Sequence, residues 1–261
     1  MVDYNPFEMI AYTGSRILEN GKTVFVGTGL PMIAAIHAQR THAPDIVIIF
    51  EAGAVGPILE MGLPISVGDT RSGVKCCVMK GLSFIFECTQ RGFIDYGFIG
   101  GAEIDQFGNA NATMMGEDYS HPKVRFPGSG GAGHMAACCE RTILIMPLEK
   151  RRFVEKLNFL TNIGYGDGSP DYRKRAGVPG QGPWRVITHM ALFGFDEETK
   201  KMTLLEVAPG YSVDDVLDRM GFEPLIPKDG VRTMPEPTAE DLKILREIDQ
   251  EGYFLKRKVK E

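Results

Sequence analysis

The stretch that decides the fold runs from residue 46 to residue 53 and reads Ile46–Val47–Ile48–Ile49–Phe50–Glu51–Ala52–Gly53. Its apolar run is β-branched up to a final aromatic residue, which predicts a strand buried on both faces of a sheet. The run ends in a carboxylate, so Glu51 should lie at the carboxyl edge of the sheet, where α/β proteins bind ligands. A solvated turn residue is the plainer interpretation of such an acid, and this stretch alone does not exclude it.

The residues before this stretch complete a strand–helix–strand unit. Thr23–Val26 predicts a short strand, and a glycine-rich turn follows it. Pro31 suits the first position of a helix that runs to about Gln39. A connection of this length, ending in the strand that stops at Glu51, is typical of a right-handed parallel crossover. An earlier helix is expected over residues 6–20.

The remaining chain adds further elements of the same kind. Residues 52–75 are irregular, and a loop of that length inside a compact domain is more often functional than not. Short apolar runs then predict strands at 76–80, 96–99 and 141–146 and a helix over 81–91. Residues 161–183 are rich in glycine and proline and contain no run long enough for an element.

The last part of the chain has a different pattern of apolar and polar residues. Apolar runs joined by tight polar turns predict an antiparallel extension at about 185–210. Ser212 and Thr238 each precede an aspartate by three residues, which predicts capped C-terminal helices within about 212–250. We therefore expect residues 1–261 to form a single α/β domain, a mainly parallel sheet flanked by helices in an open three-layer α/β/α arrangement with a late antiparallel extension.

Composition limits the function classes. The chain has 261 residues, 43% of them apolar, and a net charge of −5, which argues against nucleic acid as a partner. The five cysteines include two vicinal pairs and show neither a disulfide framework nor the spacing of a zinc site. We expect reduced thiols in a cytoplasmic protein, with no bound metal, no secretory signal and no membrane span.

A glycine-rich run, Gly128–Ser129–Gly130–Gly131–Ala132–Gly133, contains a formal G-x-G-x-x-G. The dinucleotide fingerprint needs a strong strand before it, and Arg125–Phe126–Pro127 is a poor one. Glycines nevertheless expose backbone N–H groups, which suit an anion or a developing oxyanion. A purely structural turn is an equally open interpretation.

Three other features of the sequence are interpreted more simply as structural or solvated than as functional. In Gly100–Asn109 we expect Asp105 and Asn109 to make backbone turns at a strand end. The five histidines show no metal or triad spacing, and His37 should pack in a helix or lie at its surface. Glu149–Arg152 is expected to be a solvated charge cluster, with an anion-binding role for a substrate tail as the alternative.

Taken together and in order, these motifs resemble the β subunit of glutaconate CoA-transferase and its relatives, the two-subunit family I CoA-transferases. The resemblance covers about residues 6–250. The motifs that carry it are Gly27–Pro31, Ala43–Asp45, Glu51–Gly53, Gly100–Asp105 with Gly108–Asn109, Gly128–Gly131 and Glu149–Phe153, together with the later strands.

The resemblance implies a specific chemistry. Glu51 matches the family's nucleophile, which forms a glutamyl-CoA thioester in a ping-pong exchange between an acyl-CoA and a carboxylic acid. Gly130 and Gly131 match the donors of its oxyanion hole, and Gly29, Gly53, Gly101 and Ala102 match substrate-binding positions. It also implies coenzyme A as a substrate with no resident cofactor, and a hetero-oligomer with an α subunit. The neighbours of the glutamate here are Ala52–Gly53, where transferases have Ser–Gly or Asn–Gly.

Two other functions stay open on the same scaffold. One is an acyl-CoA hydrolase or a C–C bond-cleaving enzyme, ring-opening or decarboxylating, with an acid acting as base to water. The other is a non-catalytic subunit that shapes its partner. The apolar residues 54–58 would favour a bulkier acyl group if they line the pocket.

Overall fold

The computed structural model describes residues 3–59 and 62–256, and its contacts group the chain into two compact units. Unit 1 comprises Met1–Phe98 and Glu236–Glu261, and unit 2 comprises Ile99–Pro235. Where the sequence led us to expect one domain, the two units are described separately below.

Unit 1 is built around the predicted strand–helix–strand. Its elements are α1 (Pro6–Arg16), β1 (Thr23–Val26), α2 (Leu30–Arg40), β2 (Val47–Phe50), β3 (Ala54–Val55), the 3₁₀ turn η1 (Thr70–Gly73), β4 (Val78–Met79), α3 (Leu82–Gln90), β5 (Tyr96–Ile99) and α7 (Ala239–Ile248). The strand order is β5-β1-β2-β3-β4, with β1 parallel to β2 and β5 and with β3 antiparallel to both its neighbours.

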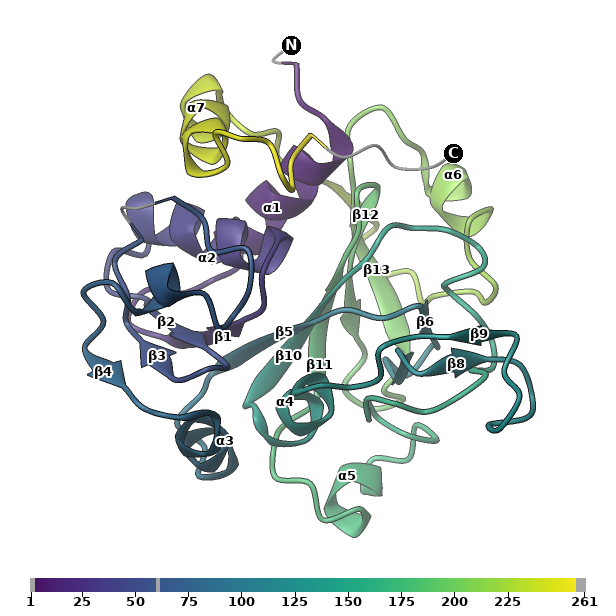
Figure 1. Ribbon diagram of the computed structural model, residues 1–261. Coiled ribbons are helices and arrows are strands. Elements are labelled where there is room, and N and C mark those ends of the chain that lie inside the picture. The colour runs from purple at the N-terminus through teal and green to yellow at the C-terminus, as the bar shows by residue number, and fades with distance from the viewer. Residues whose placement is uncertain (1–2, 60–61, 257–261) are drawn as a thin grey trace. The chain divides into compact units, whose positions relative to one another are not determined.

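Helices cover both faces of these strands, with α1 and α2 on one side and α3 on the other (Figure 1). Phe25 of β1 points toward α3, where its ring centroid lies 6.3 Å from that of Phe86. Because successive strand residues point to opposite faces, the buried Val24 and Val26 face the α1–α2 layer. Unit 1 thus has the three-layer arrangement that the sequence predicts.

Helix ends follow the local capping chemistry. Asn5 begins α1 as a capping box with Glu8, and Ser212 and Thr238 form the two predicted boxes with aspartates. The expected extent of the first helix was wrong, since α1 ends at Arg16. The Leu18 N–H donates to the Ser15 carbonyl at 3.0 Å and turns the chain before Asn20 is reached.

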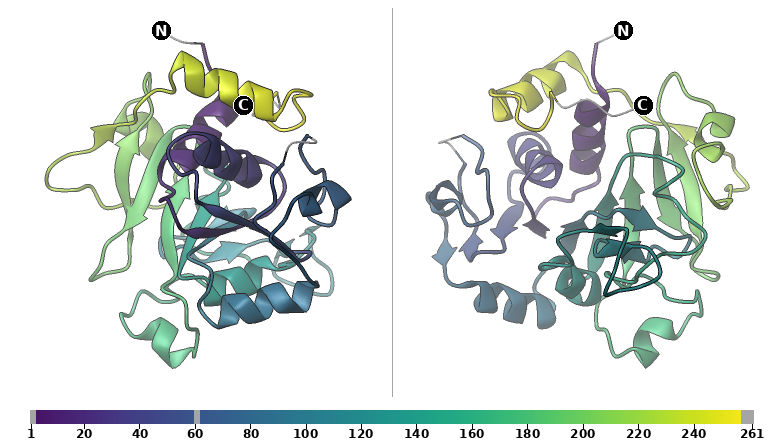
Figure 2. Two further views of the ribbon diagram at one scale, coloured as in Figure 1. Left: turned by 90° about the vertical axis from the view of Figure 1, so that its left-hand side faces the viewer. Right: turned by 45° about the vertical axis from the view of Figure 1, so that its right-hand side comes forward.

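Unit 2 contains the late antiparallel extension. Its elements are β6 (Glu103–Ile104), β7 (Ala110–Asn111), β8 (Met114–Met115), β9 (Val124–Arg125), α4 (Ala132–Cys138), β10 (Arg141–Ile145), α5 (Tyr172–Arg175), β11 (Pro183–Ile187), β12 (Ala191–Phe195), β13 (Met202–Val207), α6 (Val213–Leu217) and β14 (Arg232–Thr233). The strands β11, β12 and β13 form an antiparallel meander, and β10 and β14 add parallel strands at its two sides (Figure 2).

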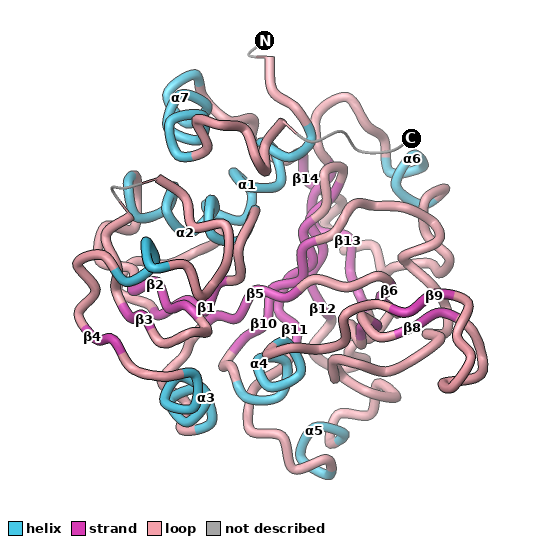
Figure 3. Tube along the Cα trace, in the orientation of Figure 1, coloured by secondary structure: helices cyan, strands magenta, loops and turns pink. Residues whose placement is uncertain are grey.

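Long connections also belong to unit 2, as the tube in Figure 3 shows. The short helix α5 lies in the 161–183 stretch, where we expected no element. Two small antiparallel pairs, β6–β7 and β8–β9, occupy the polar segment before α4. The α/β class and the antiparallel extension are confirmed, and the β2–β3–β4 pairings add an antiparallel part that the sequence did not predict.

No helix within residues 3–59 and 62–256 combines the length and the apolar character that crossing a membrane requires.

A buried histidine joins the three helices on one face of unit 1. His37 of α2 is 2% exposed, and its Nδ1 lies 2.8 Å from the Ser15 hydroxyl of α1. Its Nε2 lies 3.4 Å from Asp241 Oδ1, while the other oxygen of Asp241 caps α7. Figure 2 shows α7 beside α1. Burial lowers the pKa of His37, and the Asp241 carboxylate opposes this shift only in part. The expectation that His37 serves packing is confirmed.

This histidine should make stability depend on pH. Below its ordinary pKa of 6.5, the unfolded chain binds a proton that folded His37 resists. We therefore expect the free energy of unfolding to fall by up to about 1 kcal/mol between about pH 7.5 and about pH 5.5, measured by urea denaturation. His37→Gln should weaken this dependence, to which the buried His189 also contributes, and the exposed His121→Gln should retain it. Equal slopes in the wild type and His37→Gln would contradict the assignment.

Candidate active site

Glu51 and Gly29 lie at one edge of the unit 1 sheet. In the register of β1 and β2, Val26 is opposite Phe50, so the turns that follow both strands leave from the same edge. Gly29 ends the first turn as the N-cap of α2, and half-buried Glu51 begins the second. The predicted location of Glu51 at a carboxyl edge is therefore confirmed, and Gly29 lies at the same edge.

The turn that carries Glu51 packs tightly against a neighbouring backbone. Its Gly53 N–H donates to the Phe50 carbonyl at 3.0 Å, and the Lys80 N–H donates to the Gly53 carbonyl at 3.0 Å. Gly53 has a φ of +125°, and a Cβ there would lie 1.8 Å from the Lys80 carbonyl oxygen. Only glycine fits, so the evident role of Gly53 is to let Lys80 close the turn around Glu51.

The C-terminal segment lies beside the other turn of this edge. The Asp249 carboxylate is 4% exposed and accepts hydrogen bonds from the N–H groups of Tyr253, Phe254 and Leu255 at 2.8–2.9 Å. These three hydrogen bonds hold the Phe254 ring against Gly29, where an added Cβ would lie 3.6 Å from the ring. Residues 249–255 thus help to shape the first turn of α2.

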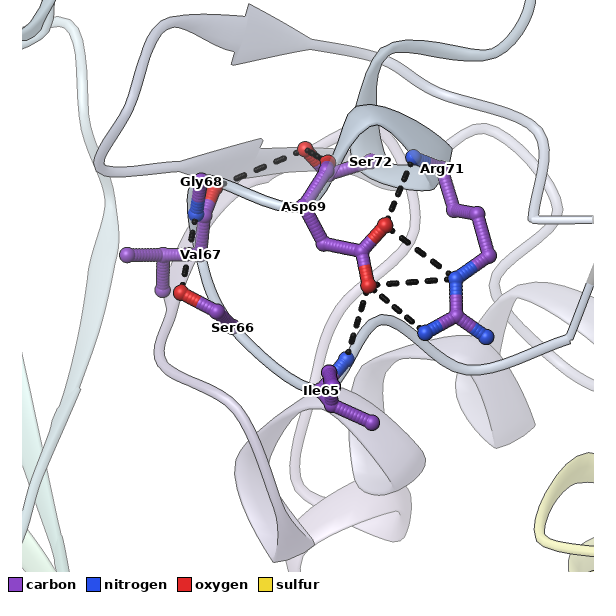
Figure 4. Close-up of polar contacts among 7 residues, drawn as sticks. All are labelled: Ile65, Ser66, Val67, Gly68, Asp69, Arg71 and Ser72. Atoms are coloured by element: carbon purple, nitrogen blue, oxygen red, sulfur yellow. Dashed lines mark hydrogen bonds and ion pairs between the residues drawn. The ribbon is translucent and has the colours of Figure 1, made fainter.

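A cavity of about 750 Å³ lies along α2, with Arg40, Leu63, Arg71 and Tyr253 among its lining residues. Figure 4 shows the loop that carries Arg71. The Arg71 guanidinium donates to both oxygens of Asp69 and lowers the pKa of that carboxyl well below its usual value. The same carboxylate accepts the Arg71 and Ile65 N–H groups. Because Asp69 neutralises Arg71, this pair orders the loop rather than offering an anion site, and Glu51 does not line the cavity.

The Gly101–Ala102 loop of unit 2 is a tight strand-end loop. The Ala102 N–H donates to the Asn111 carbonyl at 2.7 Å, and a Cβ on Gly101 would lie 3.3 Å from the same oxygen. Further on, Asp105 accepts the N–H groups of Phe107 and Asn109 and the Asn109 side-chain amide. Burial raises the pKa of Asp105, and these bonds offset part of the shift. The predicted turn-forming roles of Asp105 and Asn109 are confirmed.

The glycine-rich turn of unit 2 lies next to this loop. Gly128 and Gly130 have φ values of +93° and +49°, and a Cβ on either would meet nothing within 4 Å. The Gly128 N–H is anchored to the Ala112 carbonyl at 2.9 Å, one residue beyond the partner of Ala102. Among the described residues, the N–H groups of Gly130 and Gly131 donate no hydrogen bond. Gly130 is exposed and Gly131 is buried, so of the two it is the Gly130 N–H that lies open to an acceptor from outside this segment.

The dinucleotide interpretation of this run is not supported. It follows β9, a two-residue strand that pairs antiparallel with β8, and not a strand of a parallel crossover. The helix after it, α4, has only 7 residues.

The remaining candidates have structural surroundings. Burial alone would raise the pKa of Glu149, but Arg151 and Arg152 lower it, and Arg152 also donates to the Gly101 carbonyl at 3.3 Å. The expected solvated cluster is found only in part, since Arg151 is 70% exposed but Glu149 and Arg152 are 18% and 25% exposed. All five cysteines are free thiols. Within the described ranges, no group of three or more His, Cys, Asp or Glu side chains is placed to hold a metal ion.

Sequence reasoning missed several residues around these turns. Lys80 and Phe254 contact Gly53 and Gly29 only through the tertiary fold, so no local pattern signals them. Asn162 is fully buried and lies 3.8 Å from the position of a Cβ on Gly133, yet it comes from the stretch that showed no periodicity. Its polarity within an irregular segment gives no hint of burial.

In unit 1 a carboxylate lies at the carboxyl edge of parallel strands. Together with the order of the turns along the chain, this feature defines the class of the protein. The chain belongs to the coenzyme A transferase family, whose profile matches residues 7–219.

Particular relatives make the comparison specific. The chain is 41% identical to the B-type subunit of glutaconate CoA-transferase from Acidaminococcus fermentans, over 98% of this chain and 97% of that protein. The crystal structure of that organism's glutaconate coenzyme A-transferase superposes with a TM-score of 0.91 and 38% identity, covering 98% of this chain and 99% of the other. The chain is also 36% identical to the B-type subunit of 3-oxoadipate CoA-transferase from Pseudomonas knackmussii, over 95% of each chain. A more distant relative, at 25% identity over 84% of this chain and 81% of that protein, is the cholesterol ring-cleaving hydrolase IpdB subunit of Rhodococcus jostii.

The Gly53 contact yields a direct test of how the Glu51 turn is built. Gly53→Ala should lower the free energy of unfolding by roughly 3 kcal/mol, because the added methyl meets the Lys80 carbonyl and the backbone is left-handed.

Gly27→Ala is the matched control at the same sheet edge, since a Cβ there meets nothing within 4 Å. It should change stability by less than about 1 kcal/mol, measured by thermal or urea unfolding. Similar losses for both variants would refute the steric account.

Proposed function

We propose that this chain is the B-type subunit of a heteromeric CoA-transferase and moves coenzyme A between an acyl-CoA and a carboxylic acid. The observation that carries the proposal is the half-buried Glu51, held at the carboxyl edge of β2 in a chain of this family. Two relatives above 35% identity are named as B-type subunits of CoA-transferases, which supports both the reaction and an α-subunit partner.

In the first half-reaction, one Glu51 oxygen attacks the thioester carbonyl of the acyl-CoA, and CoA leaves as a thiolate. The product is a mixed anhydride between Glu51 and the acyl group. The thiolate then attacks the glutamyl carbonyl and releases the acyl group as a free carboxylate. Glu51 is left as a glutamyl-CoA thioester, so the nucleophile has divided one exchange into easier steps.

In the second half-reaction, the acceptor carboxylate attacks the glutamyl thioester and the same steps run in reverse. CoA leaves on a new acyl group, and Glu51 returns as a carboxylate. Each addition passes through a tetrahedral intermediate with an oxyanion. We assign its stabilisation to the N–H groups of Gly130 and Gly131, where one such donor is worth about 3 kcal/mol in related chemistry.

The remaining assignments follow the same proposal. Gly29, Gly101 and Ala102 would bring backbone close to the substrates, and Gly53 would act by holding the Glu51 turn. Coenzyme A enters as substrate, and the scheme requires no resident cofactor. The five free thiols suit a reducing compartment such as the cytoplasm. Of the apolar residues 54–58, two form β3 inside the sheet, which weakens the argument for a bulky acyl group.

Substituting the nucleophile tests the proposal. With the α subunit co-expressed, Glu51→Ala should lower kcat for CoA transfer by at least roughly 10³-fold, because the covalent route is lost. Initial rates of the wild type should show ping-pong kinetics, and hydroxylamine should inactivate it only after exposure to acyl-CoA.

Glu87→Ala, at an exposed glutamate of α3, is the control and should leave kcat unchanged. Transfer that survives Glu51→Ala would assign the chemistry to the partner subunit. Release of free CoA without an acceptor acid would instead indicate a hydrolase.

A further inference from the structure

Three buried asparagines surround the short strand β7, and one of them differs from the others. The Asn109 amide donates to Asp105 and to the Gly166 carbonyl and accepts two N–H groups. The Asn111 amide donates to Glu103 and to the Met114 carbonyl and accepts the Thr113 N–H. Both side chains are fully used. In contrast, neither the oxygen nor the nitrogen of the Asn162 amide has a partner within residues 3–59 and 62–256, although Asn162 is 0% exposed.

The backbone holds Asn162 in place without help from its side chain. The Asn162 N–H donates to the Ala110 carbonyl, and the Ala110 N–H donates to the Asn162 carbonyl, both at 2.9 Å. A buried amide with no partner destabilises the fold, and native proteins keep very few of them. A residue that is firmly placed but unsatisfied suggests that its partner arrives in another state of the protein.

The Asn162 amide faces the glycine-rich turn. A Cβ on Gly133 would lie 3.8 Å from Asn162 Oδ1, 3.7 Å from Ser129 Oγ and 3.4 Å from Ser129 Cβ. Both polar atoms therefore lie next to the space that the missing side chain of Gly133 leaves open. Ser129 is exposed, and within the described residues its hydroxyl has no hydrogen-bond partner.

Backbone hydrogen bonds anchor the turn at three points, one of which is the Ser129 carbonyl that accepts the Ala132 N–H at 2.9 Å. Gly128 is bonded to Ala112, and Gly131 accepts the Met135 N–H at 3.0 Å. Gly128 and Gly130 carry the left-handed bend on either side of Ser129, and a Cβ on either glycine would meet nothing within 4 Å. A single side-chain bond at Ser129 would fix the direction of the following N–H groups.

We propose that Asn162 is a positioning residue for this turn: when acyl-CoA binds, the Ser129 hydroxyl donates to Asn162 Oδ1 across the space beside Gly133. The bond sets the N–H groups of Gly130 and Gly131 toward the oxyanion. This inference rests on the proposed function and adds two residues to it. Neither Asn162 nor Ser129 touches the reacting atoms, so their contribution is to pre-organise the donors before charge develops.

The test compares Ser129→Ala, Asn162→Leu and the double variant in the complex with the α subunit. Each single variant should lower kcat about tenfold, with the KM for acyl-CoA unchanged, because the bond matters most in the transition state. The double variant should be no slower than either single one, since both remove the same bond. Multiplied effects in the double variant, or unchanged kcat in the single ones, would overturn the proposal.

Stability provides an independent readout. Asn162→Leu removes an unpaired buried amide, so its melting temperature should be equal to or above that of the wild type. The matched control Asn111→Leu removes a fully bonded amide at the same depth and should melt several degrees lower. A comparable fall for Asn162→Leu would identify Asn162 as a structural residue and refute the proposal.

Gly133→Ala keeps the test decisive should Asn162→Leu fail to fold. The methyl fits with ordinary contacts and improves the helix propensity of α4, yet it occupies the space beside both polar atoms, which must approach each other for the bond to form. It should therefore fold well and lose about tenfold in kcat, and full activity would contradict the proposal. CoA transfer by the wild type is measured first, and its absence would refute the proposed function. If the wild type and the variants are all fully active, only the role of Asn162 is refuted.

Discussion

The position of Glu51 depends on one steric constraint, the absence of a side chain at residue 53. The chain must reverse directly after β2, and the carbonyl of Lys80 occupies the place that a Cβ would need. This contact lets β3 and β4 pair beside β2 and holds the carboxylate at the sheet edge. A carboxylate placed by backbone packing needs no dedicated side-chain partner to hold it, which suits the role of nucleophile that we propose for Glu51.

Polar groups in the interior are used in two ways. Asp249 and Asn109 are buried and saturated with hydrogen bonds, and they tie irregular segments to the regular elements. His37 is buried with its charged form disfavoured, and the side-chain amide of Asn162 is buried with no partner among the residues that the structure describes. Saturated groups such as Asp249 and Asn109 stabilise loops that lack the regular backbone hydrogen bonds of helices and strands. The second kind lowers stability, and at Asn162 we connect that loss to function.

Much of the edge of unit 1 could be predicted because its determinants are local. The apolar run before Glu51, the proline in α2 and the spacing of the crossover lie within a short window of sequence. The capping boxes at Ser212 and Thr238 are equally local, since each joins residues three apart. Patterns of this kind depend on local backbone geometry alone, so they can be recognised without knowledge of the tertiary fold.

The rest could not be predicted because it depends on contacts between distant residues. Lys80 contacts Gly53, and Phe254 contacts Gly29, from distant parts of the chain. The hydrophobic periodicity of the sequence does not indicate such contacts. The burial of Asn162 comes from one bridge to Ala110 inside an irregular connection. Asparagine in a glycine-rich stretch is typical of an exposed turn, so the usual interpretation of its chemistry points away from its real environment.

The most direct test of the central claim is mass spectrometry of the complex with its α subunit after incubation with acyl-CoA. Digestion under mild acid should reveal the peptide that contains Glu51 with the added mass of CoA, and borohydride should convert that glutamate to its alcohol. We expect the adduct on Glu51 and its disappearance on addition of an acceptor carboxylate. Turnover of acyl-CoA with Glu51 unmodified throughout would contradict the account.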